Sequence, residues 1–103
     1  MSKKRSSKKT SHKLEQSNNL IAWTKTAWAD YLLWQDQDSK IVERINELIS
    51  VCVRTPFDGI GKPEPLRANL SGFWSRRVDR AHRLIYHYKD GTLTIISCRY
   101  HYS

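Results

Sequence analysis

The chain has 103 residues and a formal net charge of +8. A single domain of this size buries only about 60 to 65% of its unfolded surface, which disfavours a deep internal pocket and favours a surface site for a large partner. Residues 1–17 hold six Lys or Arg against one Glu, and residues 61–103 hold eight Lys or Arg against three acidic residues. Clustered positive charge is typical of nucleic-acid binders, although a solvated basic face produces the same pattern.

The two cysteines indicate a reducing compartment. Cys52 and Cys98 lie far apart, each within an apolar run, which is typical of buried free thiols in a cytoplasmic protein. No stretch approaches the roughly 18 apolar residues of a membrane span, and the basic N-terminus lacks the apolar core of a signal peptide. We therefore expect a cytoplasmic protein with no membrane partner.

Residues 1–18 are basic and almost free of apolar side chains. Such a segment cannot bury enough surface to order itself, so we expect a disordered arm. Whether this arm is native or was added by cloning stays open. Residues 19–103 are expected to form a single domain.

The folded part is predicted to begin with a strand and a helix. Residues 20–23 form a short apolar run that suits a strand. Thr24 or Thr26 can then cap a helix. The spacing of Trp28, Tyr31 and Leu32 puts these aromatic and apolar residues on one side of that helix.

A second helix is predicted more clearly. Asp38 and Ser39 can cap it, and Pro56 ends it because proline disfavours helix in the preceding residue. Its apolar stripe consists of Ile41, Ile45, Leu48, Ile49 and Cys52. Residues 55–69 contain three prolines and two glycines, which predicts a loop, and a loop of this length in a compact domain is usually functional or disordered.

Three strands are predicted beyond the loop, at residues 72–78, 84–89 and 92–98. Asp90-Gly91 is a strong hairpin signal, and a two-residue turn there pairs Lys89 with Thr92. Because paired residues share a face, the core face then receives Leu84, Tyr86, Leu93 and Ile95. The outer face receives Arg83, His87, Thr92, Thr94 and Ile96. The same register points His101 toward the core unless the strand bends or ends by about Arg99.

These elements predict an α+β fold: an N-terminal strand, then two helices packed on one face of an antiparallel β-sheet. Helices on one face leave the other face free to bind a partner. Basic residues in the second half are interleaved with aromatic ones: Lys62, Arg67, Arg76, Arg77, Arg80 and Arg83 with Phe73, Trp74, Tyr86 and Tyr88. Such a set can hold single-stranded RNA through phosphate contacts and base stacking. Core aromatics beside solvated arginines are the other interpretation.

The titratable residues of this half allow acid–base chemistry on RNA. Cleavage through the 2′-hydroxyl needs a base, a cation at the phosphorus and an acid for the leaving oxygen. The residue types for these roles are present: Glu or His can be the base, His the acid and Arg the cation. The candidates for base and acid are Glu64, His82, His87 and His101. A Glu between two prolines can equally be merely exposed, and a histidine near a terminus can be incidental. The histidines and cysteines lack metal-ligand spacing, so we expect no metal and no other cofactor.

The stretches GKPEPLRANLSGFWSRRVDRAHRLIYHY and ISCRYHY resemble the YoeB toxins of bacterial toxin–antitoxin systems, within the RelE/ParE superfamily. The resemblance runs from about Leu20 to Tyr102 and includes WADYLLWQ and IVERINELI. It implies a RelE/ParE-like α+β fold. It also implies a ribosome-dependent mRNA endonuclease that cuts the codon in the A site and so inhibits translation.

The resemblance also implies a role for each site residue. The family's catalytic residues fall on Glu64, Arg83, His101 and Tyr102. Glu64 would be the general base, Arg83 would stabilise the transition state, His101 would be the general acid, and Tyr102 would help to place the phosphate or base. RNA-backbone contacts would fall on Lys62, Arg67 and Arg77.

The implied partners are the ribosome with its mRNA and a cognate antitoxin, which would be YefM/Phd-like, acidic and partly disordered. A homodimer is open, and promoter DNA would be a partner only of the toxin–antitoxin complex. A ParE-like gyrase inhibitor and a non-catalytic RNA-binding module are the rival interpretations. ParE-like relatives lack this acid–base set, so Glu64, Arg83 and His101 together favour the nuclease.

Overall fold

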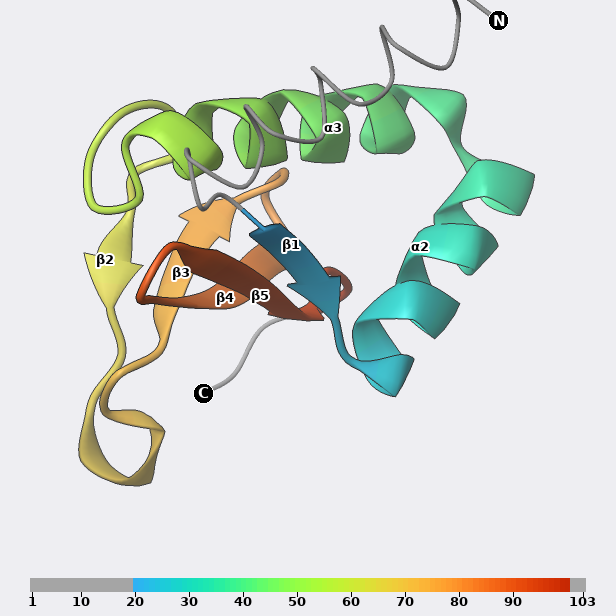
Figure 1. Ribbon diagram of the computed structural model, residues 1–103. Helices are drawn as coiled ribbons and strands as arrows, with labels where there is room; N and C mark the ends of the chain where they lie inside the picture. The colour runs from blue at the N-terminus through green and yellow to red at the C-terminus, as the bar shows by residue number, and fades with distance from the viewer. Residues whose placement is uncertain (1–19, 101–103) are drawn as a thin grey trace, which may run out of the picture.

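A computed structural model describes residues 20–100. The expected basic arm, as well as His101 and Tyr102, lie outside the described residues. Two α-helices and five strands follow one another along the chain (Figure 1). They are β1 (Leu20–Trp23), α2 (Lys25–Gln37), α3 (Ser39–Arg54), β2 (Glu64–Pro65), β3 (Trp74–Arg77), β4 (Arg83–Lys89) and β5 (Thr92–Ser97), with a 3₁₀ turn, η1 (Ala68–Leu70), after β2. No helix in this part of the chain is long and apolar enough to cross a membrane.

Both helices begin where the sequence places a capping side chain. The Thr24 hydroxyl accepts a hydrogen bond from the Ala27 N–H at 3.0 Å, so Thr24 rather than Thr26 caps α2. The Asp38 carboxylate accepts from the Lys40 N–H at 3.1 Å and caps α3. Helix α3 ends at Arg54, two residues before Pro56, as predicted.

The sheet confirms the predicted fold class and adds two features. Its strand order is β1-β5-β4-β3-β2, and all neighbours are antiparallel except β1 and β5, which run parallel. The sheet is therefore mixed, because the chain passes through both helices and the other strands before β5 returns beside β1. The expected loop at residues 55–69 also contributes β2, whose Glu64 pairs with Ser75.

The hairpin of β4 and β5 keeps the predicted register only near its turn. Lys89 pairs with Thr92, and the pairing continues to Tyr86 with Ile95. A β-bulge then makes Ile85 pair with Ser97, so Ile96 is the extra residue and the alternation shifts by one. The predicted register is therefore wrong beyond Ile95.

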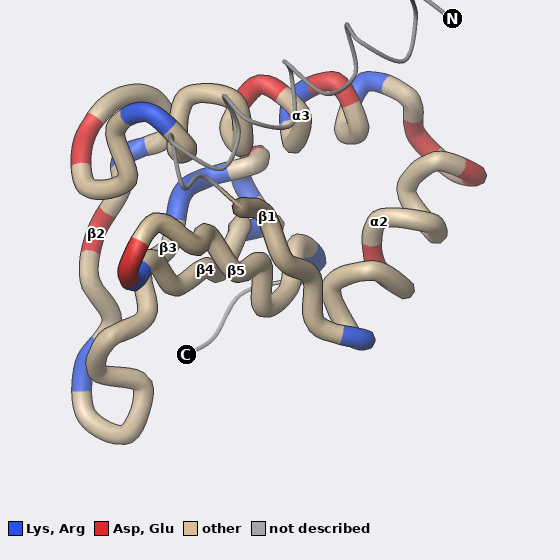
Figure 2. Tube along the Cα trace, viewed as in Figure 1, with Lys and Arg blue, Asp and Glu red and all other residues tan. Residues whose placement is uncertain are grey.

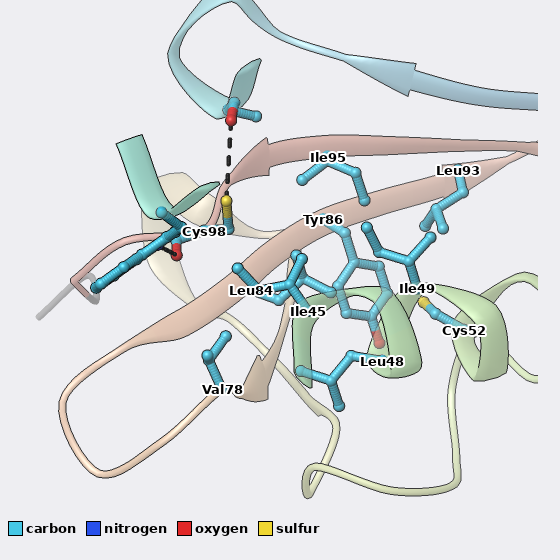
Figure 3. Close-up of a cluster of buried hydrophobic side chains, with 12 residues drawn as sticks. Ile45, Leu48, Ile49, Cys52, Val78, Leu84, Tyr86, Leu93, Ile95 and Cys98 are labelled. Atoms are coloured by element: carbon cyan, nitrogen blue, oxygen red, sulfur yellow. Dashed lines mark hydrogen bonds between the residues drawn. The ribbon is translucent and has the colours of Figure 1, made fainter. Parts of the chain in front are cut away.

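The core lies between the two helices and one face of the sheet. Figure 3 shows Leu84, Tyr86, Leu93 and Ile95 of the sheet facing four members of the α3 stripe, and the fifth, Ile41, is partly buried and packs against this cluster. From α3 the buried members are Ile45, Leu48, Ile49 and Cys52. Helix α2 contributes Ala27 and Trp34. Ile85 is 1% exposed but is not part of this cluster, because its side chain lies on the opposite face.

Arg76 is buried under α3 and is not free to meet a ligand. Its relative exposure is 0%. The guanidinium donates hydrogen bonds to the Ile60 carbonyl at 2.9 Å, the Asp58 carbonyl at 2.8 Å and the Thr55 carbonyl. The Nε–H donates to the Tyr86 hydroxyl at 3.2 Å. The basic set that we considered for RNA therefore loses Arg76, which instead holds the loop after α3.

The loop reaches the sheet through a crowded glycine. Gly61 has φ of +85°, and a Cβ there would lie 2.8 Å from Leu48 Cδ2 and 3.1 Å from Arg76 Cβ. The Gly61 carbonyl accepts a hydrogen bond from the Arg77 N–H at 2.6 Å. Only glycine combines this conformation with this close approach. The contact fixes the chain three residues before Glu64.

Replacing Arg76 should destabilise the fold much more than replacing its neighbour. Arg76→Met removes every donor from three loop carbonyls, and buried acceptors without partners cost about 1 to 3 kcal/mol each. Because a loosened loop can reach water, we expect a total loss of about 3 kcal/mol, measured by urea denaturation. Arg77→Met, at an exposed position, should cost under about 0.5 kcal/mol. Equal losses in the two variants would contradict the structural role of Arg76.

Candidate functional site

Three neighbouring strands bring candidate residues to the sheet face opposite the helices, which we call the open face. Glu64 on β2 pairs with Ser75 on β3, which pairs with Ile85 on β4. Arg77 on β3 pairs with Arg83 on β4. Paired residues share a face, and so do residues two apart on a strand. Glu64, Arg77 and Arg83 therefore project from the same side of the sheet.

The spacing of these residues follows from sheet geometry. Glu64 lies two strands from β4, and Arg83 lies two residues along β4 from Ile85. Strand spacing and rise then put the Glu64 and Arg83 Cα atoms about 12 Å apart. Glu64 is exposed and Arg83 is half-buried. Two long side chains can reach one phosphodiester across that span.

Among residues 20–100 the only ion pair joins Arg44 and Glu47 on α3, at 3.2 Å. Neither Glu64 nor Arg83 is therefore neutralised by an opposite charge within this part of the chain. The Arg83 guanidinium makes one long hydrogen bond, 3.4 Å, to the Asp79 carbonyl. Both charges remain available to a ligand.

Further basic residues lie around β2. Figure 2 shows Lys and Arg along β3, at the start of β4 and on either side of β2. Lys62 precedes β2 and has φ of +52°, and Arg67 follows β2 before the 3₁₀ turn. Both side chains are exposed. Lys62, Arg67 and Arg77 thus give this end of the sheet several accessible cations.

The aromatic residues divide between the two faces. Tyr86 is fully buried in the core, and Trp74 packs against it from the same side, so neither is free to stack on a base. Phe73 and His87 meet on the open face, with ring centroids 5.9 Å apart at 89°. The aromatic set that we considered for RNA is therefore partly core.

The segment after β5 is held beside Arg83. The Arg83 N–H donates to the Tyr100 carbonyl at 2.8 Å, and the Tyr100 N–H donates to His82 Nδ1 at 2.7 Å. His101 is bonded to Tyr100, but it lies outside the described residues, as does Tyr102. The strand ends at Ser97 and Tyr100 has φ of +62°, so strand alternation no longer governs the direction of the chain there.

Helix α2 holds the other end of this segment. The Asp30 carboxylate accepts from the Cys98 N–H at 3.0 Å, and the Trp34 indole N–H donates to the Cys98 carbonyl at 2.9 Å. The sequence did not identify Asp30 or Trp34 as part of a site. Their i, i+4 spacing on one helix face is a signal, but their distant partner could be recognised only in the fold.

Cys98 itself is buried and inert. Its Sγ lies 3.8 Å from the Ala27 carbonyl, as drawn in Figure 3. Burial, with a smaller contribution from the Asp30 charge, raises the pKa of the Cys98 thiol to about 12. Burial also raises the pKa of Cys52. Within residues 20–100 no three His, Cys, Asp or Glu side chains gather as metal ligands.

Comparison with known proteins gives one family. The model of the "YoeB-like toxin of bacterial type II toxin-antitoxin system" matches residues 23–102. The chain is 57% identical over 82 residues to "Toxin YoeB" of Escherichia coli K12, covering 80% of this chain and 98% of that protein.

Solved structures show the same fold. The YoeB/ParE toxin from Agrobacterium tumefaciens is 47% identical, with a TM-score of 0.78 over 81% of this chain and 99% of that one. A YoeB dimer from Staphylococcus aureus is 43% identical, with a TM-score of 0.77 over 82% of this chain and 99% of that one. The matching chain of the YoeB-YefM complex from the same organism is 42% identical, with a TM-score of 0.76 over 82% of this chain and 98% of that one.

Stability should fall in alkaline solution because of the buried thiol. An unfolded Cys ionises near its ordinary pKa of about 9, whereas folded Cys98 stays neutral until about pH 12. Between these values the unfolded state binds fewer protons, so the free energy of unfolding falls by up to about 1.4 kcal/mol per pH unit for this thiol. Urea titrations from pH 8.5 to 11 should show a shallower fall in Cys98→Ala, and an unchanged slope would be inconsistent with the raised pKa.

Proposed function

Because the chain belongs to the YoeB-like toxin family of bacterial type II toxin–antitoxin systems, we propose that it is a ribosome-dependent endoribonuclease. It cuts mRNA in the ribosomal A site and so stops translation. One observation carries the proposal: Glu64, Arg77 and Arg83 project from three strands onto one open face. The Tyr100 carbonyl, to which His101 is bonded, is hydrogen-bonded to the Arg83 N–H on that sheet.

The proposed mechanism divides the reaction among three side chains. Glu64 takes the proton from the 2′-hydroxyl, whose oxygen attacks the adjacent phosphorus. The bond to the 5′-oxygen breaks, and His101 gives that oxygen a proton. Arg83 stabilises the extra negative charge at phosphorus in the transition state. Within residues 20–100 the exposed carboxylate of Glu64 has no ion-pair partner, and the Arg83 guanidinium makes a long hydrogen bond of 3.4 Å to the Asp79 carbonyl; both observations support these roles.

The ribosome supplies what a shallow site lacks. General acid–base catalysis contributes about 10² to 10⁴ in rate, and correct positioning alone is worth about 7 to 11 kcal/mol. A small protein whose reactive groups stand on an open face therefore depends on a substrate that is already held in line. Lys62, Arg67 and Arg77 bind the RNA backbone, and Tyr102 helps to place the scissile phosphate or base.

We also propose that an acidic, partly disordered antitoxin of the YefM/Phd type covers the basic open face. The Staphylococcus aureus relative was solved with YefM, and its chain is almost fully covered by this one. A segment that orders on binding can wrap a large charged surface. The dimer of that relative supports the same assembly here.

Removing the proposed base, cation or acid should strongly slow site-specific cutting. Glu64→Gln keeps the shape but cannot take a proton, so we expect cleavage to slow by at least about 10²-fold. Arg83→Gln should slow it by about 10²- to 10³-fold. His101→Ala should act like the glutamate variant. The measurement is primer extension on mRNA in translating ribosomes, scored within the A-site codon.

Two exposed residues away from the open face provide matched controls. Glu43→Gln and Arg54→Gln, both on α3, remove the same kinds of charge and should cut at the wild-type rate. If Glu64→Gln and His101→Ala cut normally, the catalytic assignment is wrong. Ribosome binding without any cutting by the wild-type protein would favour the non-catalytic RNA-binding interpretation.

The basic residues around β2 should act on affinity rather than on the chemical step. Lys62→Gln, Arg67→Gln and Arg77→Gln each remove one cation from the proposed backbone contact. Each should weaken binding to mRNA-loaded ribosomes and lower the slope of log affinity against log salt by about 0.7 to 1. Filter binding from 50 to 300 mM KCl gives the slopes. Lys40→Gln, exposed on α3, should leave the slope unchanged, and three unchanged slopes would remove these residues from the RNA site.

A further inference from the structure

Tyr100 is fixed at both of its backbone polar atoms by two consecutive residues, His82 at the end of the β3–β4 connection and Arg83 at the start of β4. His82 Nδ1 accepts the Tyr100 N–H at 2.7 Å, and the Arg83 N–H donates to the Tyr100 carbonyl at 2.8 Å. Tyr100 has φ of +62°, a conformation that non-glycine residues hold only where their surroundings impose it. Two hydrogen bonds from one dipeptide impose it here.

The His82 ring is itself held in place. Its edge meets Trp34 of α2, with centroids 4.8 Å apart at 81°, and its centroid lies 5.3 Å from that of the Tyr100 ring. The Asp79 carboxylate accepts the His82 N–H at 2.8 Å, and the His82 carbonyl accepts the Val78 N–H at 2.9 Å. The loop and the helix thus present Nδ1 to Tyr100 in one orientation.

The hydrogen bond requires a particular form of His82. Nδ1 accepts a hydrogen bond from the Tyr100 N–H, so it carries no proton of its own, and a neutral ring then has its proton on Nε2. Arg99 separates Tyr100 from Cys98, which α2 holds through Asp30 and Trp34. Without the His82 acceptor, the Tyr100 backbone would keep, within the described part of the chain, only the hydrogen bond from the Arg83 N–H, and each freed residue regains substantial backbone entropy.

We propose that His82 is a positioning residue for the C-terminal catalytic segment. It acts through the backbone of Tyr100, the residue bonded to His101, and it does not touch the substrate. The inference rests on the proposed nuclease function, because His101 is the acid there. The role is distinct from a general contribution to folding, since it concerns one acceptor atom facing one N–H.

Two variants of His82 distinguish the effect of losing the Nδ1 acceptor from the effect of losing the aromatic ring. His82→Phe keeps an aromatic ring against Trp34 and Tyr100 but has no acceptor. His82→Asn loses the ring but keeps an oxygen at the position of Nδ1. One hydrogen bond of about 1 to 1.5 kcal/mol corresponds to roughly five- to tenfold. Tyr31→Phe, which removes only the exposed hydrogen bond to Asn46, is the control.

The first measurement is hydrogen exchange of the Tyr100 amide by NMR, which needs no substrate. We expect exchange to be about tenfold faster in His82→Phe and close to wild type in His82→Asn and Tyr31→Phe. Equal exchange in His82→Phe and wild type would overturn the proposal. If His82→Phe does not fold, His82→Leu, which also lacks the acceptor, takes its place.

The second measurement is the rate of mRNA cleavage on ribosomes at temperatures where every variant is folded. We expect kcat to fall about tenfold in His82→Phe with KM unchanged, and to return to within about threefold of wild type in His82→Asn. A rise in KM alone, or equal losses in both variants, would overturn the positioning role. If the wild-type protein cuts no mRNA, the proposed function fails, while amide exchange still reports on the contact between His82 and Tyr100.

Discussion

The buried guanidinium of Arg76 holds the end of α3, the following loop and the sheet together. It donates to three loop carbonyls and to Tyr86, and the Tyr86 hydroxyl donates in turn to the Pro56 carbonyl at 2.6 Å. A buried cation is costly unless its donors are all engaged. Here three backbone carbonyls and the Tyr86 hydroxyl, rather than a carboxylate, accept the hydrogen bonds, so the charge stabilises one loop conformation. That conformation delivers the chain through Gly61 to β2, and so to Glu64.

Arg76 and Gly61 thus determine where Glu64 lies, and a second set of contacts holds the C-terminal segment beside Arg83. Helix α2 holds Cys98 through Asp30 and Trp34, and Tyr100 is held by His82 of the β3–β4 connection and by Arg83 at the start of β4. The β-bulge makes the first of these contacts compatible with the hairpin, because the one-residue shift turns Cys98 into the core. The two ends of the site are thus anchored independently, on opposite sides of the open face.

Local patterns in the sequence predict most of the fold. The period of the α3 stripe, the capping side chains of Thr24 and Asp38, and the Asp90-Gly91 turn each specify structure within a few residues, and each was confirmed. The bulge at Ile85 was not predictable, because it depends on how two strands meet far from their turn. The burial of Arg76 was not predictable either, because the carbonyls that it binds lie 16 to 21 residues earlier in the chain. In the sequence, an arginine among basic and aromatic residues resembles an RNA contact.

The candidate site likewise contains residues whose position the sequence predicts and residues whose role only the fold shows. Arg83 lies on the open face, as the predicted hairpin requires. Glu64, by contrast, was expected in a loop and reaches this face only because β2 pairs with β3, and Asp30 and Trp34 acquire a role only through the distant Cys98. Within residues 20–100 neither Glu64 nor Arg83 pairs with an opposite charge, and their separation is set by the backbone of three strands. A site of this kind is preorganised for a ligand that bridges the strands, because no internal ion pair must be broken when the ligand arrives. The same absence of a direct link means that the substrate must be extended across the face before both groups can act. Under the proposed function, an mRNA held by the ribosome meets that requirement, whereas a free, flexible RNA must lose conformational entropy to do so.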